Sequence, residues 1–373
     1  MPPILILKLI NCIKSIISVL ILNLLINFNS KKVILFYFPR NDLTLKDLNY
    51  IDDLLNNLNN KYLVIYGHKL NKINKRNFYF INENFLKYLS GVNLFISNYI
   101  CDFFPIKSKR IYIHHSLYDT PLTGKKNENK TIDRIKKYDY IFLSSKKIIK
   151  SFTDIFKIAN KNTKIISTGY PRLDYFKKFK SNKKKHIIIA PANFLAYPDH
   201  TLIYSINAII KSIKKISNLK IIFRPHPANR VFFNNTKVNK YVDNFLKKYA
   251  IDKNIVLDFS EDYSKSYYDS VFMITDLSST AFTYSFLTYK PVIFFSPKEN
   301  LFKKNYNKLN HFKDRKKIGI VNSNIKSLEK SVVSFLLNSK KFKKSIKNVK
   351  SKLDYVGKSK SKTLWEIRKI IEL

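Results

Sequence analysis

The chain has 373 residues, of which 45% are hydrophobic and 25% are charged, and its formal net charge is +43 at pH 7. This length is too great for one ordinary domain and sufficient for two with separate cores, and the hydrophobic content excludes an intrinsically disordered chain. Only nine of the 69 basic residues are arginines, and lysine, asparagine and isoleucine recur throughout, as a coding bias produces. Because no arginine-rich block occurs, the charge does not predict specific nucleic-acid binding, but it suits an anionic membrane surface.

The chain has two cysteines, Cys12 and Cys101, whose spacing fits neither a disulfide framework nor a metal-binding motif. This usage fits a reducing compartment. The seven histidines show no pattern typical of a zinc site. We therefore expect no metal site and no cofactor.

Residues 4–28 form the most hydrophobic segment, and we expect residues 1–30 to be a membrane-associating helix. Lys8 and Lys14 interrupt the apolar run and no small-residue cleavage site follows, which argues against a cleaved signal peptide. The uncharged stretch after Lys14 is shorter than the ~20 residues of a spanning helix. On a helical wheel, one side carries the polar residues Lys8, Asn11, Lys14, Ser15 and Ser18. This pattern favours a helix lying in the membrane interface; a helix packed on its own domain and a spanning helix are the alternatives.

From Lys31 onward, apolar strand patterns alternate with amphipathic helix patterns, which predicts an α/β protein. The charged segment 177–185 lacks apolar periodicity and is the best linker candidate. It would join two Rossmann-like domains, residues 31–180 and 181–373, that face a central cleft. The predicted strands are 33–38, 62–66, 94–97, 111–113, 140–143, 164–167, 186–190, 219–223, 255–257, 271–274 and 318–321, with one more after Pro291. The predicted helices are 43–58, 146–158, 201–216, 238–249, 278–289, 325–337 and 362–371.

The segment IIFRPHP, residues 221–227, is a buried strand that ends abruptly on polar and proline residues. Open α/β sheets bind ligands at the carboxyl ends of their strands. His226 lies there between two prolines, and suits a catalytic acid or base or a phosphate contact, although it could also cap the neighbouring helix. Arg224 can bind a diphosphate through its fork of donors.

A second polar strand end follows at residues 271–280. The strand stops at Thr275 and Asp276, and Ser278, Ser279 and Thr280 stand where a helix begins. The free N–H groups and positive dipole end of such a helix suit a phosphate. These features predict an enzyme that handles a phosphorylated or nucleotide-activated substrate.

Two loops of the first half resemble these strand ends. His114 and His115 follow a short apolar strand and precede a loop with proline and glycine. Adjacent residues of an extended segment face opposite ways, so we expect at most one of the two imidazoles to face a given cleft. The turn GYPR, residues 169–172, uses glycine for an unusual backbone angle and places Arg172 after a strand.

With these pieces in place, the sequence resembles the CDP-glycerol glycerophosphotransferase family, the teichoic-acid polymerase-like enzymes of the GT-B fold. Five motifs occur in the family's order over about residues 111–297. The matching segments are His115-Ser116 with Thr120-Pro121-Leu122, GYPRLD at 169–174, IIIAPAN at 187–193, RPHP at 224–227, and TDLSS with KPVIFF at 275–295.

The resemblance implies a metal-independent transferase that moves a polyol phosphate from a CDP-activated donor to an acceptor hydroxyl, on a membrane-bound acceptor at the cytoplasmic face of the membrane. It implies that His115 is the base for the acceptor hydroxyl and that His226 stabilises the donor pyrophosphate or acts as the other acid or base. Ser278 and Ser279 would bind donor phosphates at the helix start, and Asp276 would position their turn.

The sequence departs from the family's pattern at several positions. Ser116 replaces a glycine, and Phe194-Leu195 replace a Trp-Arg pair. The donor therefore stays open among CDP-glycerol, CDP-ribitol and a nucleotide sugar. A GT-B glycosyltransferase that makes surface polysaccharide is the first alternative. A GT-B-like epimerase and a non-catalytic basic module that binds nucleic acid or lipid are the others.

Overall fold

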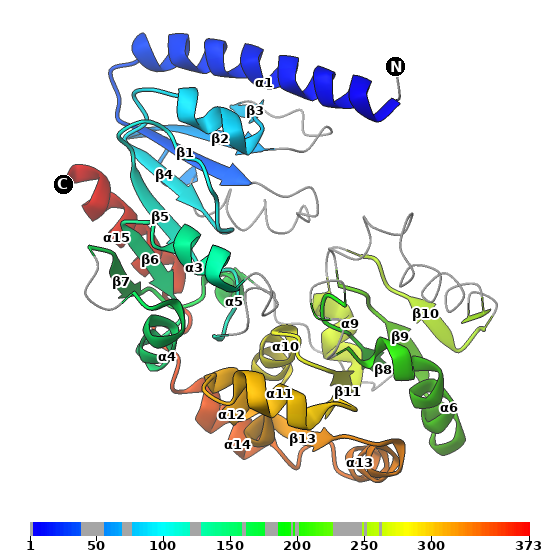
Figure 1. Cartoon of the computed structure of the whole chain (residues 1–373). Helices are drawn as coiled ribbons and strands as arrows, with labels where there is room; N and C mark the ends of the chain where they lie inside the picture. The colour runs from blue at the N-terminus through cyan, green and yellow to red at the C-terminus, as the bar shows by residue number, and fades with distance from the viewer. Residues whose placement is uncertain are drawn as a thin grey trace. The chain divides into compact units, whose positions relative to one another are not determined.

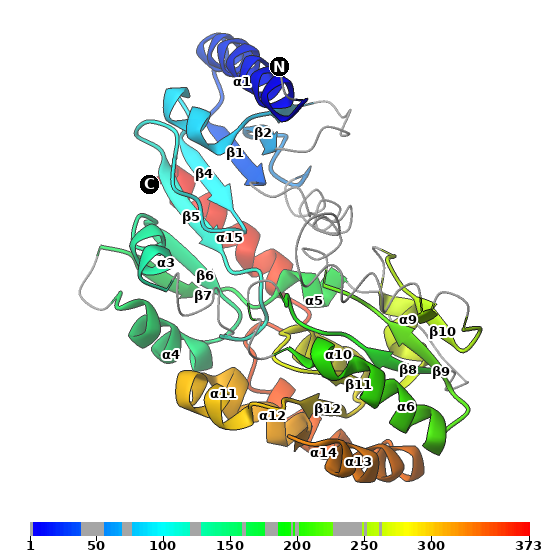
Figure 2. The same cartoon turned by 45° about the vertical axis from the view of Figure 1, so that its right-hand side comes forward.

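The computed structural model describes most of the chain in two compact units (Figures 1 and 2). The first unit contains residues 1–115, 127–174 and 354–373, and the second contains 116–126 and 175–353. The described residues are 3–38, 56–68, 77–119, 128–158, 162–175, 186–194, 197, 201–226, 248–249, 252–260 and 263–373. The predicted linker 177–185 and most of the predicted helices 43–58 and 238–249 lie outside them.

The first unit is built on a sheet of seven parallel strands in the order β3-β2-β1-β4-β5-β6-β7. Six of these strands were predicted, because each contains a short run of β-branched, leucine or aromatic residues, and most of these runs are buried in the sheet. The short edge strand β3 was missed. The strands are β1 Val33–Phe38, β2 Leu63–His68, β3 Phe78–Phe80, β4 Leu94–Ser97, β5 Lys109–Ile113, β6 Tyr140–Leu143 and β7 Lys164–Ser167.

The helices of the first unit come from both ends and from the middle of the chain. They are α1 Pro3–Asn27, η1 Glu83–Tyr88, α3 Glu128–Ile135, α4 Lys146–Phe156, α5 Pro171–Tyr175 and α15 Ser359–Glu372. The C-terminal helix α15 was expected in the second domain, but residues 354–373 belong to the first unit. Helix α15 is red in Figure 1. Its residues Leu364, Ile367 and Ile370 join the core formed by β1, β2, β4 and β5. The apolar face of a helix does not specify which sheet it covers, so the sequence could not decide this placement.

The second unit is built on six parallel strands in the order β10-β9-β8-β11-β12-β13. The strands are β8 His186–Ile189, β9 Lys220–Phe223, β10 Ile255–Leu257, β11 Ser270–Thr275, β12 Val292–Phe295 and β13 Gly319–Asn322. The helices are η3 Leu202–Ser205, α6 Ile206–Ile216, α9 Ser264–Asp269, α10 Thr280–Thr288, α11 Glu299–Tyr306, α12 Asn310–Ile318, α13 Ile325–Leu337 and α14 Lys343–Lys350. Three lysine-rich helices, α11, α12 and α14, were not predicted.

Both sheets have a Rossmann-like strand order, which confirms the predicted α/β architecture. The fourth strand of each sheet returns to pair with the first, so β4 lies beside β1 and β11 lies beside β8. In open parallel sheets this switch point is where ligands bind, outside the carboxyl ends of the strands. The functional side chains should therefore follow β4 and β5 in the first unit, and β8, β9 and β11 in the second.

The N-terminal helix α1 packs against η1 and β3 of the first unit, along one side in Figure 1. Asn82 N–H donates to Ser15 Oγ at 3.0 Å, and the Asn23 side chain donates to the Tyr88 carbonyl at 3.0 Å. Gly91, at φ +72°, lets Ile26 approach, because a Cβ at Gly91 would lie 2.6 Å from Ile26 Cγ2. The asparagine and serine side chains of the helix thus face the protein, whereas Lys8 and Lys14 are exposed.

The opposite face of α1 is apolar and exposed. Its exposed residues include Leu9, Ile13, Ile17, Leu20 and Leu24, with exposed fractions between 47% and 60%. By length and composition, Leu5–Asn27 is also the one helical segment of the described chain that could cross a bilayer.

Candidate active site

Seven residues of the first unit line a small cavity of about 40 Å³ at the carboxyl ends of β4, β5 and β7. The volume suffices for a hydroxyl group or a water molecule. Two of the predicted site residues, His115 and Arg172, thus line the same cavity. The lining residues are Asn98, Tyr99, Ile113, His114, His115, Tyr170 and Arg172.

Both histidines of the adjacent pair line this cavity, so the expectation that at most one would face it is wrong. Strand β5 ends at Ile113, and the alternation of side chains along a strand does not extend to residues beyond it. His114 is buried, with 3% of its surface exposed. His115 is partly exposed, and its ring stacks on Tyr99 with the centroids 5.2 Å apart. His115 is therefore the more accessible imidazole of the two.

A tyrosine that the sequence analysis missed connects the two imidazoles. Tyr112 Oη lies 3.1 Å from His114 Nδ1 and 3.3 Å from His115 Nδ1. Burial raises the pKa of Tyr112 further above its usual range, so the phenol stays neutral. The Tyr170 hydroxyl also donates to the His115 carbonyl at 3.0 Å. These contacts fix the backbone and one ring nitrogen of His115.

The GYPRLD segment, residues 169–174, contacts and hydrogen-bonds the residues that lead into α15. Gly169 has φ +78°, and a Cβ there would lie 2.4 Å from Ser359 Oγ. Asp174 accepts backbone N–H bonds from Gly357 and Ser359, each at 2.7 Å. The motif therefore has a structural function in this chain, in addition to placing Arg172 at the cavity.

The residues directly after His115 belong to the second unit. The Tyr118 ring stacks on Phe282 of α10 at 4.1 Å, and its hydroxyl donates to Asp314 at 2.8 Å. Asp119 accepts from the backbone N–H groups of Asn310 and His311 at the start of α12. The predicted motif residues Thr120, Pro121 and Leu122 follow outside the described residues. The first domain was predicted to include this loop, whereas its contacts assign it to the second unit.

In the second unit, Arg224 and His226 follow β9, as predicted. Arg224 is buried and donates to Asp258 Oδ2 at 2.6 Å and to Ser260 Oγ at 3.2 Å. Burial tends to raise the pKa of Asp258, but the Arg224 charge and the Ser260 hydrogen bonds outweigh it and lower that pKa. Because three of its five N–H donors bind Asp258 and Ser260, Arg224 suits a positioning role better than the predicted direct contact with a diphosphate. His226 is partly exposed.

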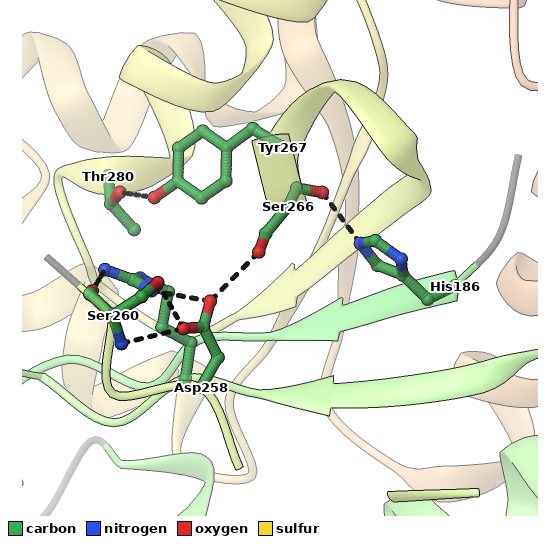
Figure 3. Close-up of polar contacts among 7 residues, drawn as sticks. His186, Asp258, Ser260, Ser266, Tyr267 and Thr280 are labelled. Carbon is green, nitrogen blue, oxygen red and sulfur yellow. Dashed lines mark hydrogen bonds and ion pairs between the residues drawn. The ribbon is translucent and has the colours of Figure 1, made fainter. Parts of the chain in front are cut away.

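Asp258 extends this network toward α9 and the start of α10, as Figure 3 shows. Its Oδ2 accepts from Ser266 Oγ at 3.0 Å, and the Ser266 carbonyl contacts His186 Nε2 at 2.7 Å. The neighbouring Tyr267 hydroxyl is hydrogen-bonded to Thr280 Oγ1. Asp258 and Tyr267 were not predicted. The sequence offers one weak signal for each: Asp258 directly follows the strand β10, and Tyr267 lies between β10 and β11.

Asp276 lies at the switch point of the second sheet and is 2% exposed. Its Oδ1 accepts from the N–H groups of Ala192 and Leu277 at 2.8 and 2.7 Å, and its Oδ2 accepts from Leu202 N–H at 3.0 Å. Burial raises the pKa of Asp276 although these three donors act to lower it. The carboxylate therefore joins the loop after β8 to the loop after β11, which supports the predicted positioning of the turn.

Ser278, Ser279 and Thr280 begin α10, as predicted. Ser278 is buried, and Ser279 and Thr280 are partly exposed. The first N–H groups of a helix have no intrahelical acceptor and carry the positive end of the helix dipole. The start of α10 can thus bind an anion at the switch point. Among the described residues there is no group of three or more His, Cys, Asp or Glu side chains arranged to hold a metal ion.

Comparisons with solved structures show which known proteins have a similar architecture. The chain is similar to the solved structure of the wall teichoic acid polymerase TagF, with 18% identity and a TM-score of 0.64 over 98% of this chain and 96% of that chain. It is also similar to S. aureus MnaA in its UDP co-structure, with 11% identity and a TM-score of 0.58 over 92% of this chain and 97% of that chain. At these identities the likeness shows the GT-B-like fold. A search of curated proteins finds no match.

The family comparison covers nearly the whole chain. The model described as CDP-glycerol:poly(glycerophosphate) glycerophosphotransferase matches residues 18–353. This range contains both sheets and every predicted site residue. The chain therefore belongs to the CDP-glycerol:poly(glycerophosphate) glycerophosphotransferase family and is a transferase.

Proposed function

We propose that this enzyme transfers glycerol phosphate from CDP-glycerol to a hydroxyl group of a membrane-bound acceptor during teichoic acid synthesis, at the cytoplasmic face of the membrane. The acceptor oxygen attacks the phosphorus that carries glycerol, the bond from that phosphorus to the bridging oxygen breaks, and CMP leaves. The observation that supports this function most directly is the family match over residues 18–353. A variant of TagF was solved after a soak with CDPG, which agrees with the proposed donor.

In the first unit, His115 is the proposed base for the acceptor hydroxyl. Its imidazole lines a cavity that admits a hydroxyl group, and it is more exposed than His114. Arg172 lines the same cavity and brings a positive charge toward the phosphate that is attacked.

In the second unit, the start of α10 is the proposed site for the donor phosphates. Ser278, Ser279 and Thr280 supply hydroxyl and N–H donors there. His226 follows the neighbouring strand end, and it is the proposed group that stabilises the charge on the departing CMP phosphate. Asp276 and Arg224 hold the loops that carry these groups.

The activity is tested by incubating the purified enzyme with CDP-glycerol and a glycerol-phosphate lipid acceptor, and by measuring CMP release and acceptor elongation. We expect turnover with CDP-glycerol and none with UDP- or CMP-sugars. His115→Ala and His226→Ala should each lower kcat by about 100-fold or more, because each removes a general acid-base group. His186→Gln is the matched control, since His186 starts β8 at the amino end of the sheet and contacts the Ser266 carbonyl, not the Ser266 hydroxyl that binds Asp258. Turnover with a nucleotide sugar instead, or wild-type rates in both alanine variants, would refute the assignment.

We place the enzyme on the membrane through the exposed face of α1. This face is apolar over its whole length, while the asparagine and serine side chains of the helix bind the first unit. A helix held in this way presents leucines and isoleucines outward and suits the interface of a bilayer. The exposed Lys8 and Lys14 and the net charge of +43 complement an anionic lipid surface.

Membrane binding is tested by flotation with vesicles that contain phosphatidylglycerol or only phosphatidylcholine. Replacing Leu9, Ile13, Leu20 and Leu24 together by serine removes side chains that would each contribute about 1 kcal/mol, so binding should weaken roughly a thousandfold. The matched control replaces the exposed Val333 and Leu337 of α13 by serine. Unchanged flotation of the α1 variant would exclude α1 as the membrane contact.

A further inference from the structure

The buried hydroxyl of Tyr112 lies within hydrogen-bonding distance of two imidazole nitrogens at once. The distance from Oη is 3.1 Å to His114 Nδ1 and 3.3 Å to His115 Nδ1. Tyr112 is completely buried, and its pKa is raised above the usual range, so it carries one proton at any pH at which the enzyme works. A neutral hydroxyl has one O–H to donate and two lone pairs to accept with.

These contacts restrict the tautomers of both histidines. The Tyr112 proton can be donated to only one of the two Nδ1 atoms. The other contact is a hydrogen bond only if that second Nδ1 carries a proton and donates it to Tyr112 Oη. Two Nδ1–H imidazoles would leave the buried Tyr112 O–H without an acceptor at either contact, which is costly. When the hydroxyl donates to one Nδ1 and accepts from the other, one imidazole is protonated on Nε2 and the other on Nδ1.

We infer that Tyr112 is a positioning residue, which donates to His114 and accepts from Nδ1–H of His115, so that Nε2 of His115 is left as the basic atom. This inference rests on the proposed function, in which His115 takes the proton of the acceptor hydroxyl. Since Tyr112 occupies Nδ1, the base must be Nε2, and Nε2 has a lone pair only when the proton is on Nδ1.

The hydrogen bond between His115 Nδ1–H and Tyr112 Oη also persists when His115 is protonated. When His115 has taken a proton it is an imidazolium, and its Nδ1–H still donates to Tyr112 Oη. Neither ring has to rotate during turnover. The groups that face His115 are Tyr99, which stacks on it, His114, Tyr112, Tyr170 and Arg172, and Arg172 is the only permanent charge among these described neighbours.

The tautomer can be measured without any substrate. Long-range proton-nitrogen spectra of protein labelled with ¹⁵N-histidine distinguish an Nδ1–H from an Nε2–H imidazole, and His115→Gln identifies the His115 signals. We expect His115 to be the Nδ1–H tautomer and His114 the Nε2–H tautomer in the wild type. In Tyr112→Phe, the Nδ1–H population of His115 should fall. A wild-type His115 protonated on Nε2 would overturn the inference.

Kinetics supply the second readout. Tyr112→Phe should lower kcat about tenfold, which corresponds to the loss of one hydrogen bond, and should leave KM for CDP-glycerol unchanged. Tyr62→Phe is the matched control, because the Tyr62 hydroxyl donates to Glu372 at 2.6 Å just before β2, at the amino end of the same sheet. If Tyr112→Phe does not fold, His114→Phe serves instead. It removes the acceptor for the Tyr112 proton, which can then be donated to His115, so kcat should again fall.

The outcomes separate this inference from the proposed function. If the wild type transfers no glycerol phosphate, the proposed function fails while the tautomer measurement still stands by itself. If the wild type is active and the rate of Tyr112→Phe equals that of Tyr62→Phe, the inference fails and the proposed function stands.

Discussion

The clearest test of how the second unit is organised is the substitution Asp276→Asn. The carboxylate accepts three backbone N–H bonds, from Ala192 and Leu277 at Oδ1 and from Leu202 at Oδ2. An asparagine can keep Oδ1 in place, but its amide then stands where Oδ2 was. That amide and the Leu202 N–H are both donors, so the Leu202 N–H loses its partner in a buried position.

The cost follows from these contacts. A buried donor without a partner costs about 1–3 kcal/mol. Because burial raises the pKa of Asp276, its charge is itself unfavourable there, and replacing it by a neutral group offsets part of this cost. We therefore expect a loss of about 1–2 kcal/mol in the free energy of unfolding. Asp276→Ala would leave three donors without partners, and its larger loss approaches the ~5–15 kcal/mol that stabilises a typical domain, so asparagine is the more informative variant.

The assay is urea denaturation at neutral pH together with the KM for CDP-glycerol. The loss should lower the urea midpoint by roughly 0.5–1 M. The KM should rise, because Asp276 joins the loops around the start of α10. Asp252→Asn is the control, since Asp252 lies at the surface with Lys214 and an exposed ion pair contributes less than about 1 kcal/mol. If Asp276→Asn has the same urea midpoint and the same KM for CDP-glycerol as this control, then Asp276 does not hold the loops after β8 and β11 together.

Two further predictions concern a buried imidazole and a glycine. Burial, aided by the Arg315 charge, lowers the pKa of His311 from 6.5 to about 3. Below pH 6.5 His311 takes up a proton in the unfolded chain but not in the folded chain. The free energy of unfolding therefore decreases as the pH is lowered, by about 2 kcal/mol at pH 5 relative to neutral pH. In His311→Phe, the free energy of unfolding measured by urea denaturation should no longer decrease in this way between pH 7 and pH 5. A variant with the same pH dependence as the wild type would contradict the assignment to His311. Gly91→Ala should lower stability by more than the roughly 1–2 kcal/mol of a left-handed backbone, because its Cβ would meet Ile26 of α1. Gly357→Ala is the control, since it has the same backbone conformation with no atom within 4 Å, and equal melting temperatures would exclude the Ile26 contact.

The sequence alone determined the strands and the motifs at their ends. Buried parallel strands are short runs of apolar residues, so β1, β4, β6 and β10 were predicted within one residue of their bounds. The residues that follow such strands are polar for a local reason, because the chain leaves the sheet there. His115, His226 and Ser278 could therefore be assigned to strand ends or to a helix start without a structure.

Only the tertiary structure decided which of these side chains meet and what each one contacts. Arg224 was expected to bind phosphate, and the structure adds a contact of its guanidinium with Asp258, which is distant in sequence. Helix α15 covers the first sheet and not the second, and α1 turns its asparagine and serine side chains toward the protein. The Tyr112 hydroxyl contacts both histidines because β5 ends at Ile113. Each of these facts depends on packing between segments or on where a strand stops, and an apolar periodicity carries no information about either.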